Sequence, residues 1–486
     1  MKKIFIIPFL FAAILCSCED ALMESPRNFI SPTNYYKTAA DAEGAILGVY
    51  EVRSNYNLLS AMYMIEESHN DYAVPRGSYA PIDNIDQPFE SVTTGRTNGM
   101  WNDLYIVINR ANVVLSRIPG INMDESAKKR ILAEAYFLRA EAYRELVQKW
   151  GGVPLRLEET VDLSTLAAPR NSVSEVYAQI ISDLKIAEVD LPEDIGVRTG
   201  RASKWAAKIR LADAYLGIED WANAAAKAEE VINSGKYSLV TVEKESDFYK
   251  IFATETCSED IFSAHFSDIS TAFQNMVQWM HYTDTYGYCP GEGWWCLYVN
   301  VNSPLINNWD KKDLRFQFNI YSGFYNKDGD WVDNPPATPL LFKKYIKDAN
   351  ARATHSVPWI RFAEAFLIYA EAACMANNNP TDLALERLNI IKRRGYGEAL
   401  NSPSAIDYPN GMSAASFRAT VIKERAYEFM LECRRFWDLK RTNTIKQELM
   451  DAKGKTYIDT RLLYPIPQPE ISNNPALTQA DQNPGY

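Results

Sequence analysis

The chain has 486 residues, of which 47% are apolar and 23% charged, so it has the composition of an ordinary globular protein and length enough for one large domain or two to four smaller ones. Its formal net charge is −11 and it has no basic block, which excludes nucleic acid as a partner on electrostatic grounds and disfavours polyanionic ligands outside a local basic pocket. The aromatic share is raised to 12%, with 28 Tyr and 11 Trp, and aromatic side chains line binding surfaces as well as cores.

The first 18 residues, MKKIFIIPFLFAAILCSC, have the pattern of a secretory signal. Two lysines precede an apolar stretch from Ile4 to Leu15 that is too short to span a bilayer as a mature helix. The closing LCSC resembles a bacterial lipobox, with Cys18 as the residue acylated after cleavage. We therefore expect residues 1–17 to be a lipoprotein signal peptide and a lipid on Cys18 to hold the protein at a membrane. A plain secretory signal with an incidental cysteine is the alternative.

Apolar residues recur with the 3.6-residue period of an α-helix in several segments, and the clearest of these segments come as pairs. Residues 204–237 predict a helical hairpin that turns at Glu219 and Asp220 and ends at Gly235, and the pattern of this hairpin resembles a tetratricopeptide repeat. Residues 359–395 predict a second pair. Further helices are predicted near 38–50, 101–118, 131–150 and 174–191. Because one repeat cannot bury its own apolar face, we expect the pairs to stack into a curved solenoid.

Between about residues 236 and 357 the helical pattern breaks. This segment is rich in Gly, Pro, Asn, Asp and aromatic residues and has short strand-like pieces, so we interpret it as a loop-rich insertion, where binding residues gather. The last 25 residues contain five prolines and are predicted to run extended over the surface or into a groove.

No familiar catalytic or metal-binding motif is found. The four histidines lack a zinc-binding HExxH spacing, and the sequence has no G-x-S-x-G elbow, P-loop or dinucleotide fingerprint. The stretch NKDGD, residues 326–330, lacks the later glutamate of an EF-hand, so it predicts a hairpin turn rather than a calcium loop.

Residues 422–441, IKERAYEFMLECRRFWDLKR, predict one highly charged helix. Glu424, Glu428 and Glu432 fall on one face of it and could mimic the carboxylate pair of a glycoside hydrolase. Charges at ion-pair spacing follow: Glu432 with Arg435, and Arg434 with Asp438. A structural charge lattice is the favoured interpretation.

The strongest binding signal is an aromatic cluster around CPGEGWWC, residues 289–296. Eight aromatic residues lie between residues 273 and 298: Phe273, Trp279, Tyr282, Tyr286, Tyr288, Trp294, Trp295 and Tyr298. Glycines and a proline exclude a long helix here. Flat aromatic faces suit the stacking of a sugar ring, whereas a satellite hydrophobic core is the alternative. Neighbours in an extended loop point opposite ways, so we expect one of Trp294 and Trp295 at the ligand and the other packed beneath it.

Two further features accompany this cluster. The segment ESHNDYAVPRGSYAPID contains Asn70, Asp71, Tyr72, Arg76 and Tyr79 around a proline and a glycine, which suits vicinal hydroxyls or a peptide backbone as ligand; solvated loop residues are the alternative. The predicted mature chain also keeps five cysteines besides Cys18, which is too few for a disulfide scaffold. Cys289 and Cys296 either close the aromatic loop as a disulfide or remain buried thiols.

The chain as a whole resembles the SusD/RagB family of outer-membrane nutrient-binding lipoproteins from Bacteroidetes. The resemblance is carried by the lipobox followed by CED and, in order, by AYFLRAEAYRELVQKWGGVPL, EEVINSGKYSL, IRFAEAFLIYAEA, KERAYEFMLECRRFWDLKR and YPIPQPEISNNPALTQ. These stretches extend over nearly the whole mature chain.

The resemblance implies a mostly α-helical SusD-like fold for a single domain of residues 18–486, with tetratricopeptide-like helix pairs that support a loop-rich half with short strands. It also implies lipid anchoring through Cys18 on the outer face of the outer membrane. A SusC-like TonB-dependent transporter is the implied partner, to which the protein would deliver captured oligosaccharide without catalysis, cofactor or metal.

The residue 70–79 loop falls where relatives often place ligand contacts, whereas the aromatic loop varies between relatives. The expected glycan-binding residues are Asn70, Tyr72, Arg76, Tyr79, Trp279, Tyr282, Tyr286, Trp294, Trp295 and Tyr298. Peptide capture, as in RagB-like relatives, is the alternative function. Two hypotheses are weaker: a glycoside hydrolase that uses Glu428 or Glu432, and a pure scaffold that binds the transporter alone.

Overall fold

A computed structural model describes residues 35–162, 167–252, 256–266, 276–282, 284–290, 293–346 and 356–486, so the predicted signal segment and Cys18 lie outside the described residues. Helices dominate and strands are short, which confirms the mostly α fold. The helices outside the loop-rich segment are α2 (Ala39–Arg53), α3 (Tyr56–Ser68), α4 (Ser91–Arg117), α5 (Glu125–Trp150), α6 (Val173–Asp190), α7 (Lys204–Gly217), α8 (Trp221–Ile232), α13 (Ala363–Asn377), α14 (Asp382–Gly395), α15 (Ala414–Glu428), α16 (Arg435–Arg441), α17 (Ile445–Lys453) and α18 (Gln468–Asn473). Among the described residues, no helix has both the length and the apolar content that crossing a membrane requires.

The predicted helices begin and end at the signals that the sequence supplies. Thr38 and Asp41 form a reciprocal capping box at the start of α2, and α5 ends at Gly151, where φ is 75°. α4 begins earlier than predicted because the carboxylate of Glu90 accepts hydrogen bonds from the amides of Val92 and Thr93 and so caps a polar first turn.

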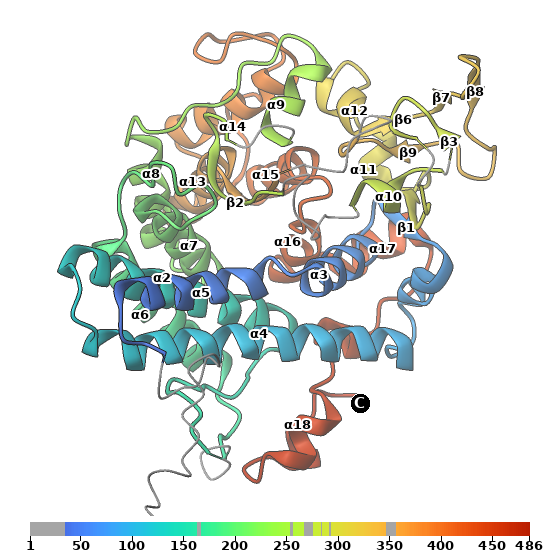
Figure 1. Ribbon diagram of the computed structural model, residues 1–486. Coiled ribbons are helices and arrows are strands. Elements are labelled where there is room, and N and C mark those ends of the chain that lie inside the picture. Colours follow the sequence, from blue (N-terminus) through green and yellow to red (C-terminus); the bar gives the residue numbers. More distant parts are fainter. Residues whose placement is uncertain are drawn as a thin grey trace, which may run out of the picture.

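The helix pairs stack as expected of a tetratricopeptide-like scaffold. α5 packs between α4 and α6, α8 packs against α7 and α13, and α13 packs against α14 and α15. Figure 1 shows α2, α4, α5 and α6 together on one side of the molecule and the short strands β1, β3, β6 and β9 gathered on the other. The apolar faces of the pairs and of the loop-rich segment share one large core.

The loop-rich segment holds many short elements, and two more, β1 (Ala73–Pro75) and the 3₁₀ helix η2 (Gly77–Asp83), join it from the N-terminal side. It contains η5 (Glu245–Phe248), α9 (Tyr249–Phe252), β2 (Asp260–Ala264), α10 (Met276–Met280), β3 (Asp284–Thr285), β4 (Cys289–Pro290), β5 (Leu297–Val299), α11 (Pro304–Asn307), α12 (Leu314–Asn319), β6 (Ile320–Tyr321), β7 (Gly323–Tyr325), β8 (Trp331–Asp333), β9 (Leu341–Phe342) and β10 (Val357–Arg361). In the described part of the chain the strands pair two by two and antiparallel: β1 with β5, β2 with β10, β3 with β4, β6 with β9 and β7 with β8. The amide of Asn326 donates to the carbonyl of Asp330 (2.9 Å) in the turn between β7 and β8, so the hairpin prediction is confirmed.

The single helix predicted over residues 422–441 is wrong, because the chain breaks between α15 and α16. Leu431 and Cys433 adopt left-handed backbone angles, with φ of 61° and 55°. Their amides donate to the phenol oxygen of Tyr72 (3.0 Å) and to the carboxylate of Glu67 (2.6 Å). These two buried acceptors take amides that a continuous helix would have bonded internally.

A buried charge lattice is present on the glutamate face of α15, but its partners come from distant elements. Glu428 binds Arg315 of α12 (3.2 Å), Arg361 of β10 (2.5 Å) and Arg394 of α14. The local pairings predicted from spacing are wrong, since Glu432 pairs with Lys344 and Arg361, Arg434 with Glu364, Arg435 with Asp71, and Asp438 with Arg425 and Arg441. Burial of all three glutamates leaves none of them in position to act on a substrate.

The proline-rich end runs along the scaffold largely as predicted. The indole N–H of Trp150 donates to the carbonyl of Pro465 (2.9 Å), and the amide of Tyr464 donates to the carbonyl of Lys149 (2.8 Å). The short helix α18 is a departure from the expectation; its proline is tolerated because it lies in the first turn, where no internal amide bond is needed.

The lattice predicts a large stability cost for removing its central carboxylate. Glu428→Ala leaves three arginines without their shared partner and should lower the free energy of unfolding by about 3–5 kcal/mol. Glu51→Ala is the matched control, because Glu51 pairs with Arg110 at the exposed surface and should cost about 0–1 kcal/mol. Urea unfolding measures both; equal losses would contradict a central role for Glu428.

The same carboxylate predicts acid sensitivity. Burial would raise the pKa of Glu428, but the charges of Arg394, Arg361 and Arg315 hold this pKa well below its ordinary 4.5. The stability that the ionised group supplies is therefore present above pH 4.5 and is lost as the pH falls below it. The difference in unfolding free energy between the wild type and Glu428→Gln should shrink between pH 5.5 and about 3.5. A difference that stays constant across this range would argue against the ion pairs.

Candidate functional site

The two binding segments predicted from sequence lie side by side. β1 pairs with β5, so that Ala73 opposes Val299 and Pro75 opposes Leu297. The pairing continues one residue further, where the amide of Arg76 donates to the carbonyl of Cys296 (2.7 Å). The 70–79 loop and the aromatic loop therefore form one surface, although they are far apart in sequence.

The tryptophan loop is anchored to the carbonyl end of α10. The amides of Trp294, Trp295 and Cys296 donate to the carbonyls of Gln278 (2.6 Å), His281 (3.0 Å) and Trp279 (2.7 Å). The loop thereby supplies hydrogen-bond donors to carbonyls in and just after α10. Cys289 and Cys296 are thiols and are not joined to each other, so hydrogen bonds rather than a disulfide hold this loop.

A glycine allows this close approach. A Cβ built on Gly293 would lie 2.1 Å from the carbonyl oxygen of Tyr282 and 2.2 Å from that of His281. Real Cβ contacts are never this short, so any other residue would displace the loop. Two residues further on, Trp295 adopts a left-handed φ of 47°.

The two tryptophans have different surroundings. The guanidinium of Arg76 lies 3.7 Å from the ring centroid of Trp295, and the ring of Tyr282 lies 4.1 Å from it. These two contacts cover part of the Trp295 indole, which is half-buried. Trp294 is 50% exposed. Trp294 therefore faces solvent and Trp295 is packed, as predicted for the pair, but the left-handed φ of Trp295 means that alternation of an extended loop is not the reason.

Three of the predicted ligand residues are buried and make internal contacts, so we correct their assignment. Asn70 caps its own turn by accepting hydrogen bonds from the amides of Tyr72 and Ala73. Tyr72 donates its phenol O–H to Glu67 and accepts the Leu431 amide, and burial raises its pKa well above 10. Trp279 lies in the core. These side chains position the loops and do not reach a ligand from where they lie.

The remaining predicted residues lie at or near the surface. Arg76 is exposed, Tyr286 is 38% exposed, and Tyr79 packs against the guanidinium of Arg96 (4.1 Å). Tyr282 and Tyr298 are half-buried and pack, with Tyr288 and Trp295, on a small cluster of Tyr321, Phe324 and Leu341 that is separate from the main core. The satellite-core interpretation thus holds for the inner members of the aromatic cluster, and among its described members Trp294 and Tyr286 are exposed. Phe273 lies outside the described residues.

Sequence reasoning missed a second exposed aromatic pair, Tyr325 and Trp331, which flank the NKDGD turn on β7 and β8. The sequence contained a signal for this pair, because one aromatic residue lies on each side of the predicted hairpin turn. A cavity of about 680 Å³ along α15 is lined by other residues, among them Tyr427, Arg435 and Glu448. Within the described residues, no group of three or more His, Cys, Asp or Glu side chains is arranged to hold a metal ion.

Comparison with known proteins places the chain. A SusD-like family model described as "Starch-binding associating with outer membrane" matches residues 37–216, and the SusD family model matches residues 298–486. The chain is 27% identical to SusD-like protein P25 of Formosa agariphila over the full length of both chains.

Solved structures share the fold. A SusD-like protein from Bacteroides fragilis superposes with a TM-score of 0.79 at 22% identity, covering 94% of this chain and 99% of that one. A laminarin-binding SusD-like protein superposes with a TM-score of 0.74 at 22% identity, covering 93% and 100%. The two family models cover most of the helical scaffold and the C-terminal third, and the chain belongs to the SusD/RagB family.

Proposed function

We propose that this protein is a cell-surface glycan-binding lipoprotein. A lipid on Cys18 holds it at the outer membrane, and it captures oligosaccharide and delivers it to a SusC-like TonB-dependent transporter. The observation that carries the proposal is the half-exposed indole of Trp294, presented by a loop that backbone hydrogen bonds fix to α10.

This arrangement suits a neutral sugar ring. A flat indole face offers dispersion and C–H contacts to a pyranose, and a fixed loop loses little conformational entropy when the ligand binds. The exposed guanidinium of Arg76 and phenol of Tyr286 lie in the same two segments and supply donors and an acceptor for sugar hydroxyls. The laminarin-binding structural neighbour supports a neutral glycan as the ligand class.

The site assignment predicts different results for the two tryptophans. Trp294→Ala removes the exposed stacking face and should lower the affinity for a captured oligosaccharide about tenfold or more without changing the melting temperature. Trp295→Ala removes an indole packed between Arg76 and Tyr282 and should lower the melting temperature. Calorimetric screening of oligosaccharides and oligopeptides against the soluble protein, followed by titration of both variants, makes the measurement.

Three outcomes of this screen are decisive. Full affinity in Trp294→Ala would remove the site assignment and leave the family membership intact. Binding of peptides in place of sugars would overturn glycan capture in favour of the RagB-like alternative. Release of cleaved product would instead indicate a hydrolase.

The loop geometry predicts that Gly293 is required for binding. Gly293→Ala places a methyl group against the carbonyls of Tyr282 and His281, so the loop must shift and the 294–296 amides should exchange hydrogen faster. The affinity for oligosaccharide should fall as the exchange of these amides becomes faster. Gly287→Ala is the matched control, since a Cβ there meets nothing within 4 Å. Unchanged exchange in Gly293→Ala, measured by mass spectrometry, would show that the loop is not held in this way.

A further inference from the structure

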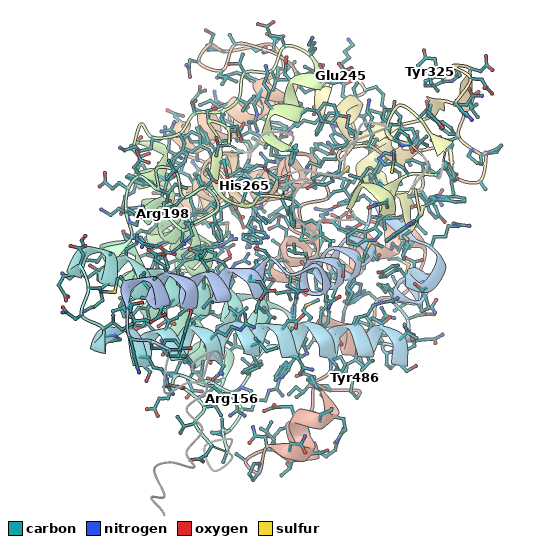
Figure 2. The ribbon with its side chains drawn as sticks, in the orientation of Figure 1. Arg156, Arg198, Glu245, His265, Tyr325 and Tyr486 are labelled. Carbon is teal, nitrogen blue, oxygen red and sulfur yellow. The ribbon has the colours of Figure 1, made fainter. Side chains whose placement is uncertain are left out.

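The β7–β8 hairpin carries an exposed aromatic pair that lies outside the site described above. Tyr325 and Trp331 are 57% and 51% exposed and oppose each other across the hairpin. Their ring centroids are 5.3 Å apart and their planes meet at 76°. Figure 1 shows this hairpin extending from the loop-rich half, and Figure 2 shows Tyr325 at its outer end. An exposed aromatic surface of this kind marks an interaction site.

The pair occupies the outer face of the hairpin. Side chains alternate across a strand, so Tyr325 and its cross-strand partner Trp331 share one face, and Phe324 and its partner Val332 share the other. Phe324 is buried and its ring centroid lies 6.3 Å from that of Tyr282, which contacts Trp295. The inner face is therefore turned toward the aromatic cluster of the first site, and Tyr325 and Trp331 face away from it.

The position of the Trp331 indole is fixed by the hairpin itself. Its N–H donates to Oδ1 of Asp333 (2.9 Å), and its ring lies against the backbone of Gly323, where a Cβ would come within 2.5 Å of the ring. The indole thus lies against the strand at Gly323, and the ring of Tyr325 is nearly perpendicular to it. A ligand that stacks on the outer face would find the ring already ordered, so little rotamer entropy is lost.

The polar groups around the pair favour a hydroxyl-rich neutral ligand. Asp328, Asp330 and Asp333 lie on the turn and on β8, against one lysine, Lys327. Carboxylates accept hydrogen bonds from sugar hydroxyls, whereas this excess of negative charge repels anionic lipid and phosphate. Two aromatic rings set at an angle provide a floor and a wall for one pyranose unit.

We infer that Tyr325 and Trp331 form a second glycan-stacking site, separate from Trp294, which binds another unit of the same polysaccharide chain. The inference rests on the proposed function, because both sites take the same class of ligand. A chain that reaches both sites binds with an affinity raised by the effective concentration of its second contact, whereas a short oligosaccharide engages each site independently.

Affinity electrophoresis in gels of laminarin, amylopectin, xylan and galactomannan, followed by calorimetry with a trisaccharide of the retained polymer, tests this. Trp331→Ala and Tyr325→Ala should each weaken polymer binding about tenfold while the trisaccharide affinity of the Trp294 site stays within about twofold. Val332→Ala is the matched control on the inner face of the same hairpin and should bind polymer like the wild type. Far-UV circular dichroism and melting temperature show whether each variant is folded.

A direct readout keeps the test decisive even if a hairpin variant is unstable. In Trp294→Ala labelled with 5-fluorotryptophan, the ¹⁹F resonance of Trp331, assigned by Trp331→Phe, should shift when the trisaccharide is added. A resonance that does not move overturns the second site, and so does wild-type polymer affinity in Trp331→Ala. In either case, loss of trisaccharide binding in Trp294→Ala still supports the proposed function. If Trp331→Ala loses trisaccharide affinity at the Trp294 site, the second site is also overturned, because the hairpin would then act only by holding the Trp294 site in place. A wild type that binds no glycan removes the proposed function itself.

Discussion

The arrangement of this protein depends on the buried carboxylate of Glu428, which forms ion pairs with three arginines. Arg315 comes from α12, Arg361 from β10 and Arg394 from α14, so elements of the loop-rich segment and of the helical scaffold meet at one carboxylate. A buried charge without a partner costs several kcal/mol, and apolar contacts alone would tolerate many relative positions of the two halves. In this arrangement Glu428 and each of the three arginines have an oppositely charged partner. Glu259, beside β2, extends it by binding Arg394 and thus ties the antiparallel β2–β10 pair to the same centre.

A second buried ion pair connects the segment before β1 to the start of α16. Arg435, at the start of α16, binds Asp71 through two hydrogen bonds of 2.9 and 2.6 Å. The next residue, Tyr72, accepts the amide of Leu431 in the break before α16, and β1 follows directly. Arg76 directly follows β1, and its guanidinium lies over the ring of Trp295. The left-handed residues of the break thus have a consequence at the surface, because they offer the amides that hold this segment.

The helices were predictable because their apolar period and their caps are local, as the capping box of α2 and the glycine after α5 show. The break between α15 and α16 was not, since the apolar period continues through it and the acceptors that cause it lie on α3 and in the loop that follows. Asn70 and Tyr72 were misassigned for the same reason: a polar loop residue has the same sequence pattern whether it faces solvent or a buried partner. The different environments of Trp294 and Trp295 agree with the prediction, but its premise of an extended loop fails at Trp295, where φ is 47°.

The form of the exposed aromatic surface bears on the kind of ligand it suits. Trp294 lies on an open loop, and the cavity along α15 has no tryptophan in its lining. An enclosed pocket selects the end of a chain, because only an end fits within it. An open indole stacks on the face of any unit and lets the chain extend in both directions, so it suits internal units of a long polymer. Because such a contact desolvates only one face of the sugar, each is weak alone. A surface of this kind gains affinity chiefly by contacting the same chain more than once.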